Sequence, residues 1–127
     1  MKKYRMLILA VLMITGLTGC NKEETYMQID MEEAVEMMKK ETDYIILDVR
    51  TPEEFAEGHI PDAVNVPNET IKSKKIPELP SEDQLILVYC RSGNRSKQAS
   101  EKLAKIGYTK VYEFGGINDW PGEIVSD

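Results

Sequence analysis

The sequence predicts one α/β domain with a twisted, mainly parallel sheet flanked by helices. From residue 26 onward, strand-like and helix-like segments alternate, which is typical of such sheets. Residues 45–47 and 85–89 are continuous apolar runs, as expected of parallel strands that are buried on both faces. The chain has 127 residues, which suits a single domain once a targeting segment is removed.

The predicted domain begins with a short strand and an amphipathic helix. Residues 26–29 form the strand-like segment. Asp30 is placed to cap a helix over residues 31–40, and Glu33, three residues later, completes a capping-box pattern.

A second strand is predicted over residues 44–49, with a short helix directly after it. Thr51 is a suitable cap, and Pro52 fits the first helical position. The acidic residues that follow interact favourably with the positive end of the helix dipole, and Gly58 ends the helix.

The middle of the chain predicts a brief strand, a loop region and the central strand. The brief strand spans residues 63–66, and residues 69–75 form a turn or two of helix. Pro77 and Pro80 mark a loop. Residues 85–89 are the most hydrophobic segment, so we expect them to lie at the centre of the sheet.

The last elements are a helix, a strand and a short helical turn. The apolar residues of segment 96–106 recur at helical spacing, and Gly107 is the expected stop. Residues 111–114 form the last strand, the glycines at 115–116 a turn, and residues 117–120 a short helical turn.

The charge balance argues against nucleic acid and anionic lipid as partners. The net charge is −6, and residues 1–19 hold three of the 16 basic residues but none of the 22 acidic ones. Without them the net charge is −9, which repels polyanions.

The first twenty residues have the organisation of a secretory signal. Residues 1–5 carry three positive charges and residues 6–14 are an unbroken apolar run. This run is too short for a membrane-spanning helix, which needs about 20 residues. A basic start, an apolar centre and small residues at the cut are typical of a signal peptide. Residues 17–20, which read Leu-Thr-Gly-Cys, resemble the lipobox of bacterial lipoproteins.

This resemblance implies that residues 1–19 are a lipoprotein signal peptide and that the Cys20 sulfur carries lipid, such as palmitate. Residues 20–25 would then be the lipidated cysteine and a short tether, and residues 26–127 the domain. The expected location is the extracytoplasmic side of a bacterial cell membrane, with the membrane as a partner through Cys20. A lipidated Cys20 leaves Cys90 without an internal disulfide partner. The alternative is an ordinary signal peptide with an incidental cysteine at its end.

The loop after the predicted central strand carries the candidate chemistry. Ligands of parallel α/β sheets bind at the carboxyl ends of the strands, where Cys90 lies. A curled loop that leads into a helix can direct several N–H groups inward, and these groups favour a thiolate. Two arginines in the loop favour it further. The loop residues are Arg91, Ser92, Gly93, Asn94, Arg95 and Ser96.

Five segments in this order resemble the rhodanese family. They are residues 47–50, 53–55, 58–61, 90–96 and 115–120, and the resemblance covers roughly residues 26–121. It implies a rhodanese-like fold and a sulfurtransferase whose Cys90 cycles between thiolate and persulfide. The partners would be a small sulfur-containing anion such as thiosulfate and a thiophilic acceptor such as cyanide or a thiol, with no cofactor. Asp62 departs from the family, which commonly has glycine there.

Other polar residues near these segments have structural interpretations. Asp48 and Arg50 end a strand and could support substrate binding, but a salt bridge that holds the loops is the favoured interpretation. His59 is expected to make a structural hydrogen bond and Trp120 to pack. One histidine and one free cysteine do not supply the ligands of a zinc site.

Two other functions stay open. One is a non-enzymatic sulfur carrier or redox-linked binding module, which leaves a protein partner open. The other is a phosphatase or arsenate reductase, but those enzymes generally place one more residue between cysteine and arginine to hold a tetrahedral oxyanion.

Overall fold

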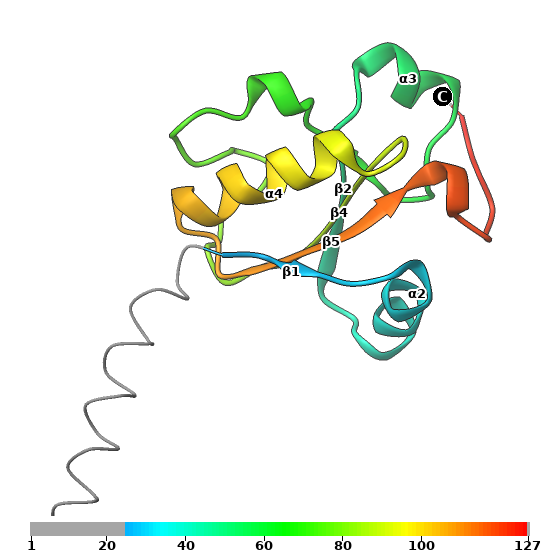
Figure 1. Ribbon diagram of the computed structural model, residues 1–127, viewed down its shortest axis with the longest axis horizontal. Coiled ribbons are helices and arrows are strands. Elements are labelled where there is room, and N and C mark those ends of the chain that lie inside the picture. The colour runs from blue at the N-terminus through cyan, green and yellow to red at the C-terminus, as the bar shows by residue number, and fades with distance from the viewer. Residues whose placement is uncertain (1–24, 127) are drawn as a thin grey trace, which may run out of the picture.

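The computed structural model describes residues 25–126, which form a five-stranded parallel sheet with helices on both faces (Figure 1). The strand order is β1-β5-β4-β2-β3, and every pairing is parallel. The strands are β1 (Met27–Gln28), β2 (Tyr44–Asp48), β3 (Val64–Asn65), β4 (Leu85–Cys90) and β5 (Lys110–Gly116). This confirms the predicted fold class, with β4 at the centre. The predicted signal peptide, Cys20 and all of the tether except Thr25 lie outside the described residues.

Three helices and two 3₁₀ turns connect the strands. They are α2 (Met31–Lys40), α3 (Pro52–Glu57), α4 (Asn94–Ile106), η1 (Asn68–Thr70) and η2 (Ile117–Asp119). The predicted capping box of α2 is present, because Asp30 and Glu33 cap the helix reciprocally. Thr51 caps α3 as predicted, and Glu54 completes a second capping box that the sequence analysis did not predict. Gly107 ends α4 with a φ of 128°, as expected of a glycine stop.

The sheet separates two hydrophobic cores. Alternate residues of β4 serve each core: Ile86, Val88 and Cys90 face α4, while Leu87 and Tyr89 face α2. Because both faces are covered, β4 is buried along nearly its whole length, which accounts for its continuous apolar sequence.

Three sequence predictions need correction. The helix expected over residues 69–75 is a single 3₁₀ turn that ends at Thr70. Ile71 and Ile76 are buried in the core, and the residues between them are polar and exposed. This segment therefore has no apolar face at helical spacing that could pack as a helix. Helix α4 begins at Asn94 instead of residue 96, because Gly93 turns the chain with a φ of 118°. The glycines at 115–116 belong to β5.

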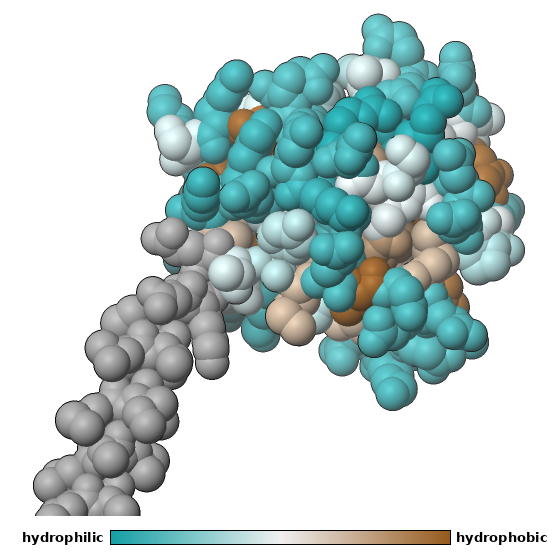
Figure 2. Space-filling model, in the orientation of Figure 1, coloured by the Kyte–Doolittle hydropathy of each residue, from teal (hydrophilic) through white to brown (hydrophobic). Residues whose placement is uncertain are grey.

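The outer surface is mainly polar. Figure 2 shows that hydrophilic residues cover most of this face and that apolar surface gathers in a small area between β1 and α2. Among residues 25–126, no helix has the length and apolar character needed to cross a bilayer.

Candidate active site

Cys90 lies at the carboxyl end of the central strand, on the face of the sheet that α4 covers. Its side chain is 1% exposed and forms no disulfide among the described residues. Only Arg91, Ser92 and Gly93 separate it from the first residue of α4. The N–H groups of the first helical turn have no acceptors within the helix, and the positive end of the helix dipole lies there, so this position favours an anionic sulfur.

Two groups contact the Cys90 sulfur directly. The backbone N–H of Gly93 donates a hydrogen bond to Sγ at 3.0 Å, and Sγ lies 3.4 Å from the Ser96 hydroxyl. The sequence predicted several inward amides, whereas one amide donates to this sulfur in the described structure. Glycine suits this position because its φ is 118°, a conformation in which a side chain is strained.

The two loop arginines bind a glutamate instead of the cysteine. Arg95 donates two hydrogen bonds to the Glu54 carboxylate, at 2.8 and 3.1 Å, and Arg91 contacts it at 3.3 Å. The sequence predicted that both arginines favour a thiolate at Cys90; in the structure their hydrogen bonds go to Glu54, and any effect of these guanidinium groups on the sulfur acts through their charge. The hydrogen bond from Arg95 is the main cause that holds the pKa of Glu54 well below its usual value. Glu54 in turn raises the pKa of Arg95, and a smaller part of that rise comes from the charge of Cys90.

Asp48 and Arg50 form a buried salt bridge, as the structural interpretation predicted. Their shortest contact, from Arg50 Nη2 to Asp48 Oδ2, is 2.7 Å, and both side chains are almost fully buried. Arg50 also donates to the carbonyl of Gly58 at 2.7 Å, and the Tyr89 hydroxyl donates to Asp48 at 2.6 Å. This network ties β2 and β4 to the segment after α3. It therefore holds the loops around the site together.

The other residues that the sequence analysis singled out have structural roles. The His59 ring lies 2.9 Å from the carbonyl of Phe55 and stacks on the Phe55 ring, as expected of a structural histidine. Trp120 packs at the edge of the α2 core. Asp62 has a φ of 70°, so it adopts the left-handed turn that glycine adopts more readily in the family.

Gly116 of β5 packs closely against the backbone of the active-site loop. A Cβ atom on Gly116 would lie 1.9 Å from the Arg91 carbonyl oxygen, so only glycine permits this approach. Asn118 N–H donates to the same carbonyl at 3.2 Å. The loop from Cys90 to Gly93 is therefore held by β5 and η2 as well as by its own helix.

Sequence reasoning missed Glu113, which is 1% exposed and lies next to the site. Its carboxylate oxygen Oε2 accepts hydrogen bonds from Ser96 Oγ at 2.5 Å and from Gly115 N–H at 2.9 Å. The available signal was its position in β5. Because Val111 of this strand faces the α4 core, strand alternation directs Glu113 to that face also, where an apolar residue is expected.

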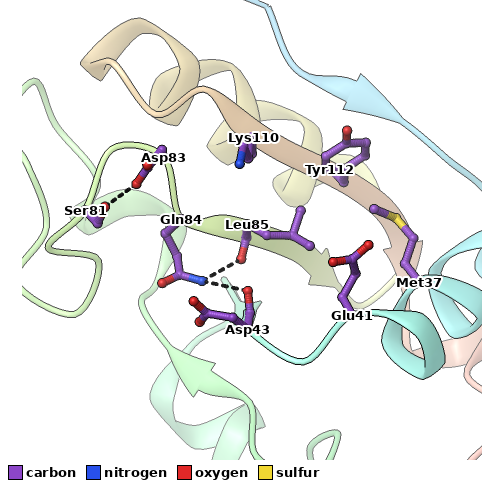
Figure 3. Close-up of a pocket in the computed structure, with 9 residues that line it drawn as sticks. All are labelled: Met37, Glu41, Asp43, Ser81, Asp83, Gln84, Leu85, Lys110 and Tyr112. Carbon is purple, nitrogen blue, oxygen red and sulfur yellow. Dashed lines mark hydrogen bonds between the residues drawn. The ribbon is translucent and has the colours of Figure 1, made fainter.

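A cavity of about 490 Å³ lies beside the loop. Its lining includes Ser92 and Gly93 of the loop, Glu113 and Gly115 of β5, and Lys97 of α4. Another cavity, of about 550 Å³, is lined by Asp43, Gln84, Lys110 and their neighbours, near the starts of β2, β4 and β5 (Figure 3). That cavity lies at the amino ends of these strands, whereas Cys90 lies at the carboxyl end of β4. Within residues 25–126, no three histidine, cysteine, aspartate or glutamate side chains form a candidate metal site.

Comparison with known proteins identifies the family of this arrangement. The family model of the rhodanese-like domain matches residues 30–123. The chain belongs to the rhodanese-like family. A sulfurtransferase of Allochromatium vinosum is 39% identical over 94 residues, which cover 73% of this chain and 86% of the relative. The thiosulfate sulfurtransferase PspE of Escherichia coli K12 is 37% identical over 73 residues, covering 58% and 70% of the two chains.

Solved rhodanese structures have the same fold. A rhodanese-related protein from Thermoplasma volcanium matches with a TM-score of 0.67 at 30% identity, over 80% of this chain and 100% of that one. A rhodanese from E. coli, solved with anions, matches with a TM-score of 0.59 at 32% identity, over 66% and 99% of the two chains. The rhodanese-like fold predicted from the five sequence segments is therefore confirmed.

Proposed function

We propose that this rhodanese-type sulfurtransferase carries sulfane sulfur as a persulfide on Cys90. The observation that carries the proposal is the contact from the Gly93 amide to Cys90 Sγ at 3.0 Å, at the start of α4. A hydrogen-bond donor and a helix N-terminus at this point stabilise a thiolate, which is the nucleophilic form of cysteine. The relatives named as sulfurtransferases support the same reaction class.

In the first half-reaction, the Cys90 thiolate attacks the outer sulfur of a donor such as thiosulfate. A new S–S bond forms to Cys90, the S–S bond of the donor breaks, and sulfite leaves with the electron pair. In the second half-reaction, a nucleophilic acceptor such as cyanide or a thiol attacks the outer sulfur, and the Cys90 thiolate leaves. The Gly93 amide is placed to stabilise the thiolate at the start and the end of this cycle.

The charges around the loop suit a small anionic donor. Arg91 and Arg95 share one acidic partner, Glu54, so the group of three keeps a net positive charge near the site. Arg91 is 61% exposed at the protein surface, where it can meet an incoming anion. This local charge stands out in a chain whose overall charge is negative.

The separation of Cys90 and Arg95 favours sulfur transfer over phosphate chemistry. Four residues, 91–94, lie between Cys90 and Arg95, one fewer than phosphatases and arsenate reductases generally have between cysteine and arginine. A loop of this size holds a single sulfur atom more readily than a tetrahedral oxyanion, which phosphatases and arsenate reductases accommodate with a longer loop.

The test is persulfide formation by the purified domain. After incubation with thiosulfate, intact-protein mass spectrometry should detect one added sulfur atom on Cys90, and addition of cyanide should remove it. Cys90→Ser should abolish both the sulfur adduct and the release of sulfite. No added sulfur with any of several donors, or turnover of a phosphate ester, would contradict the proposal.

We also propose that the enzyme acts at the extracytoplasmic side of a bacterial membrane, held by lipid on Cys20. The support is the order of basic, apolar and small residues before Cys20 in the sequence. Mass spectrometry of the protein extracted from its own membrane should show a chain that begins at Cys20 with acyl groups attached. A chain that keeps residues 1–19, or an unmodified Cys20, would contradict this part.

A further inference from the structure

A buried carboxylate connects to the Cys90 sulfur through one hydroxyl group. The Oε2 atom of Glu113 lies 2.5 Å from Ser96 Oγ, and Ser96 Oγ lies 3.4 Å from Cys90 Sγ. All three side chains are at most 1% exposed. The sulfur, the hydroxyl oxygen and the carboxylate oxygen therefore form one continuous chain of hydrogen bonds shielded from solvent.

The Ser96 hydroxyl has one proton, which serves only one neighbour at a time. The carbonyl oxygens of Gly93, at 3.0 Å, and Gly115, at 3.4 Å, are also within reach of this proton. An ionised Glu113 is the strongest acceptor of the three, so it takes the hydrogen bond, and Ser96 Oγ then accepts one from the Cys90 thiol. When Glu113 is protonated, it donates to Ser96 Oγ, and the hydroxyl can donate to a Cys90 thiolate. The protonation of Glu113 thus frees the hydroxyl proton for the thiolate, which as an anion is a stronger acceptor than the competing carbonyl of Gly93.

We propose that Glu113 is a positioning residue that shares one proton with Cys90 through the Ser96 hydroxyl. In the transfer, the S–H bond of Cys90 breaks as its proton passes to Ser96 Oγ, and the sulfur keeps the electron pair. The Ser96 O–H bond breaks as that proton passes to Glu113 Oε2, so the three groups keep a single negative charge between them. The reactive state is a thiolate beside a neutral Glu113. The inference rests on the proposed function in taking Cys90 as the reactive group.

The arrangement makes full ionisation of the pair unfavourable. Loss of a second proton would place two negative charges in one buried site, where they repel each other. The proton can still leave, because Glu113 lines the 490 Å³ cavity beside the loop.

The other charged groups near the pair lie mostly at the surface. On the cavity side they are Asp30, Lys97 and Asp119, all exposed. Arg95 is half-buried, and its charge interacts with Cys90. On the β1 side is Tyr26, whose pKa is raised by burial and by the charges of Glu113 and Glu101. Solvent screens the exposed groups, so Glu113 and Arg95 are the charged groups near Cys90 that are screened least.

The decisive experiment is the pH dependence of Cys90 alkylation by iodoacetamide, measured without a sulfur donor. Glu113→Gln keeps an acceptor for Ser96 but removes the shared charge and the proton site. We expect the pH midpoint of alkylation to fall by about one unit or more, so that the rate below the midpoint rises about tenfold. A midpoint that is unchanged from wild type would overturn the inference, as would an equal shift in Glu78→Gln, a control that removes an exposed charge in a distant loop.

The route through Ser96 is tested by a double-mutant cycle. In the Ser96→Ala background, Glu113→Gln should shift the midpoint less than it does in wild type, because only the through-space effect of the charge remains and the effect of the shared hydrogen bond is lost. Equal shifts in the two backgrounds would overturn the role of the hydroxyl.

A measurement on the wild-type protein removes any dependence on variant folding. The ¹³C chemical shift of the Glu113 carboxyl, followed as a function of pH, should show a second inflection at the pH where Cys90 becomes reactive. Alkylation of Cys90 should abolish this second inflection. A carboxyl signal without this inflection would overturn the proposal. Since alkylation requires no sulfur donor, failure of persulfide formation in wild type would instead count against the proposed function.

Discussion

The Arg95 guanidinium is held by Glu54 through two hydrogen bonds, of 2.8 and 3.1 Å, that join α4 to α3. Glu54 also accepts from the Thr51 backbone at 2.9 Å as part of its capping box. One carboxylate therefore orients the helix that follows Cys90 and caps the short helix beside it.

Glu54→Gln should destabilise the domain by about 1–2 kcal/mol near neutral pH, because it replaces charge-assisted hydrogen bonds with neutral ones. Arg91 adds little to this figure, since its side chain is largely exposed. The pKa of Glu54 is lower in the folded state than in the unfolded chain, so its contribution is full above the unfolded value of about 4.5 and is lost as the pH falls below it. Urea unfolding should show the wild-type advantage shrinking in that acidic range. An advantage that is the same at every pH would contradict this assignment.

Asp48→Ala should be the more damaging change, with a loss of about 3–5 kcal/mol. It leaves the Arg50 charge buried without its main partner and removes the acceptor of the Tyr89 hydroxyl. Burial is the largest cause that raises the pKa of Tyr89, and it persists in the variant, so the phenol stays neutral and does not pair with Arg50 in place of Asp48. Denaturant unfolding of Asp48→Ala and of the exposed control Asp43→Ala gives the comparison. A loss below about 1 kcal/mol for Asp48→Ala would show that water or a neighbour replaces the carboxylate.

The sequence predicted the elements that depend on local signals. Asp30 with Glu33 and Thr51 with Pro52 marked helix starts correctly, because capping depends on residues a few positions apart. The continuous apolar run of β4 is also a local signal, and it correctly placed Cys90 at the end of the central strand. The helix predicted over residues 69–75 failed because the packing of Ile71 and Ile76, and not local propensity, sets the path of that segment.

The partners of charged side chains were harder to predict. Arg91 and Arg95 are close to Cys90 in the sequence, but their acidic partner, Glu54, comes from a helix about forty positions earlier. Glu113 reaches Ser96 across the pairing of β5 with β4 and the packing of α4, which no local pattern encodes. A sequence reveals the residue types of such a site, whereas the fold decides which charges meet.

Asp62 adopts a left-handed turn conformation at a position where the family commonly has glycine. Substitutions of Asp62 therefore test how much this conformation affects stability. With a φ of 70°, the position is strained for most side chains, although aspartate tolerates it better than others. Asp62→Gly should therefore leave stability unchanged or raise it by up to about 1 kcal/mol, whereas Asp62→Val should lower it by about 1–2 kcal/mol. Thermal unfolding of the two variants measures the difference. A valine variant as stable as the glycine variant would show that the turn adopts another backbone conformation in solution.

Gly116 should be the most sensitive backbone position around Cys90. A methyl group there would overlap the Arg91 carbonyl, whose oxygen would lie 1.9 Å away, so Gly116→Ala has to displace the loop or break β5. Since the loop sets the distance between the Gly93 amide and Cys90, we expect a loss of persulfide formation of at least about tenfold. Gly115→Ala is the matched control, because nothing lies within 4 Å of its added atom and its positive φ costs about 1 kcal/mol of stability. Persulfide yield and thermal unfolding, measured together, separate the two effects. Equal persulfide yields in both alanine variants would mean that the loop tolerates movement and that β5 does not position Cys90.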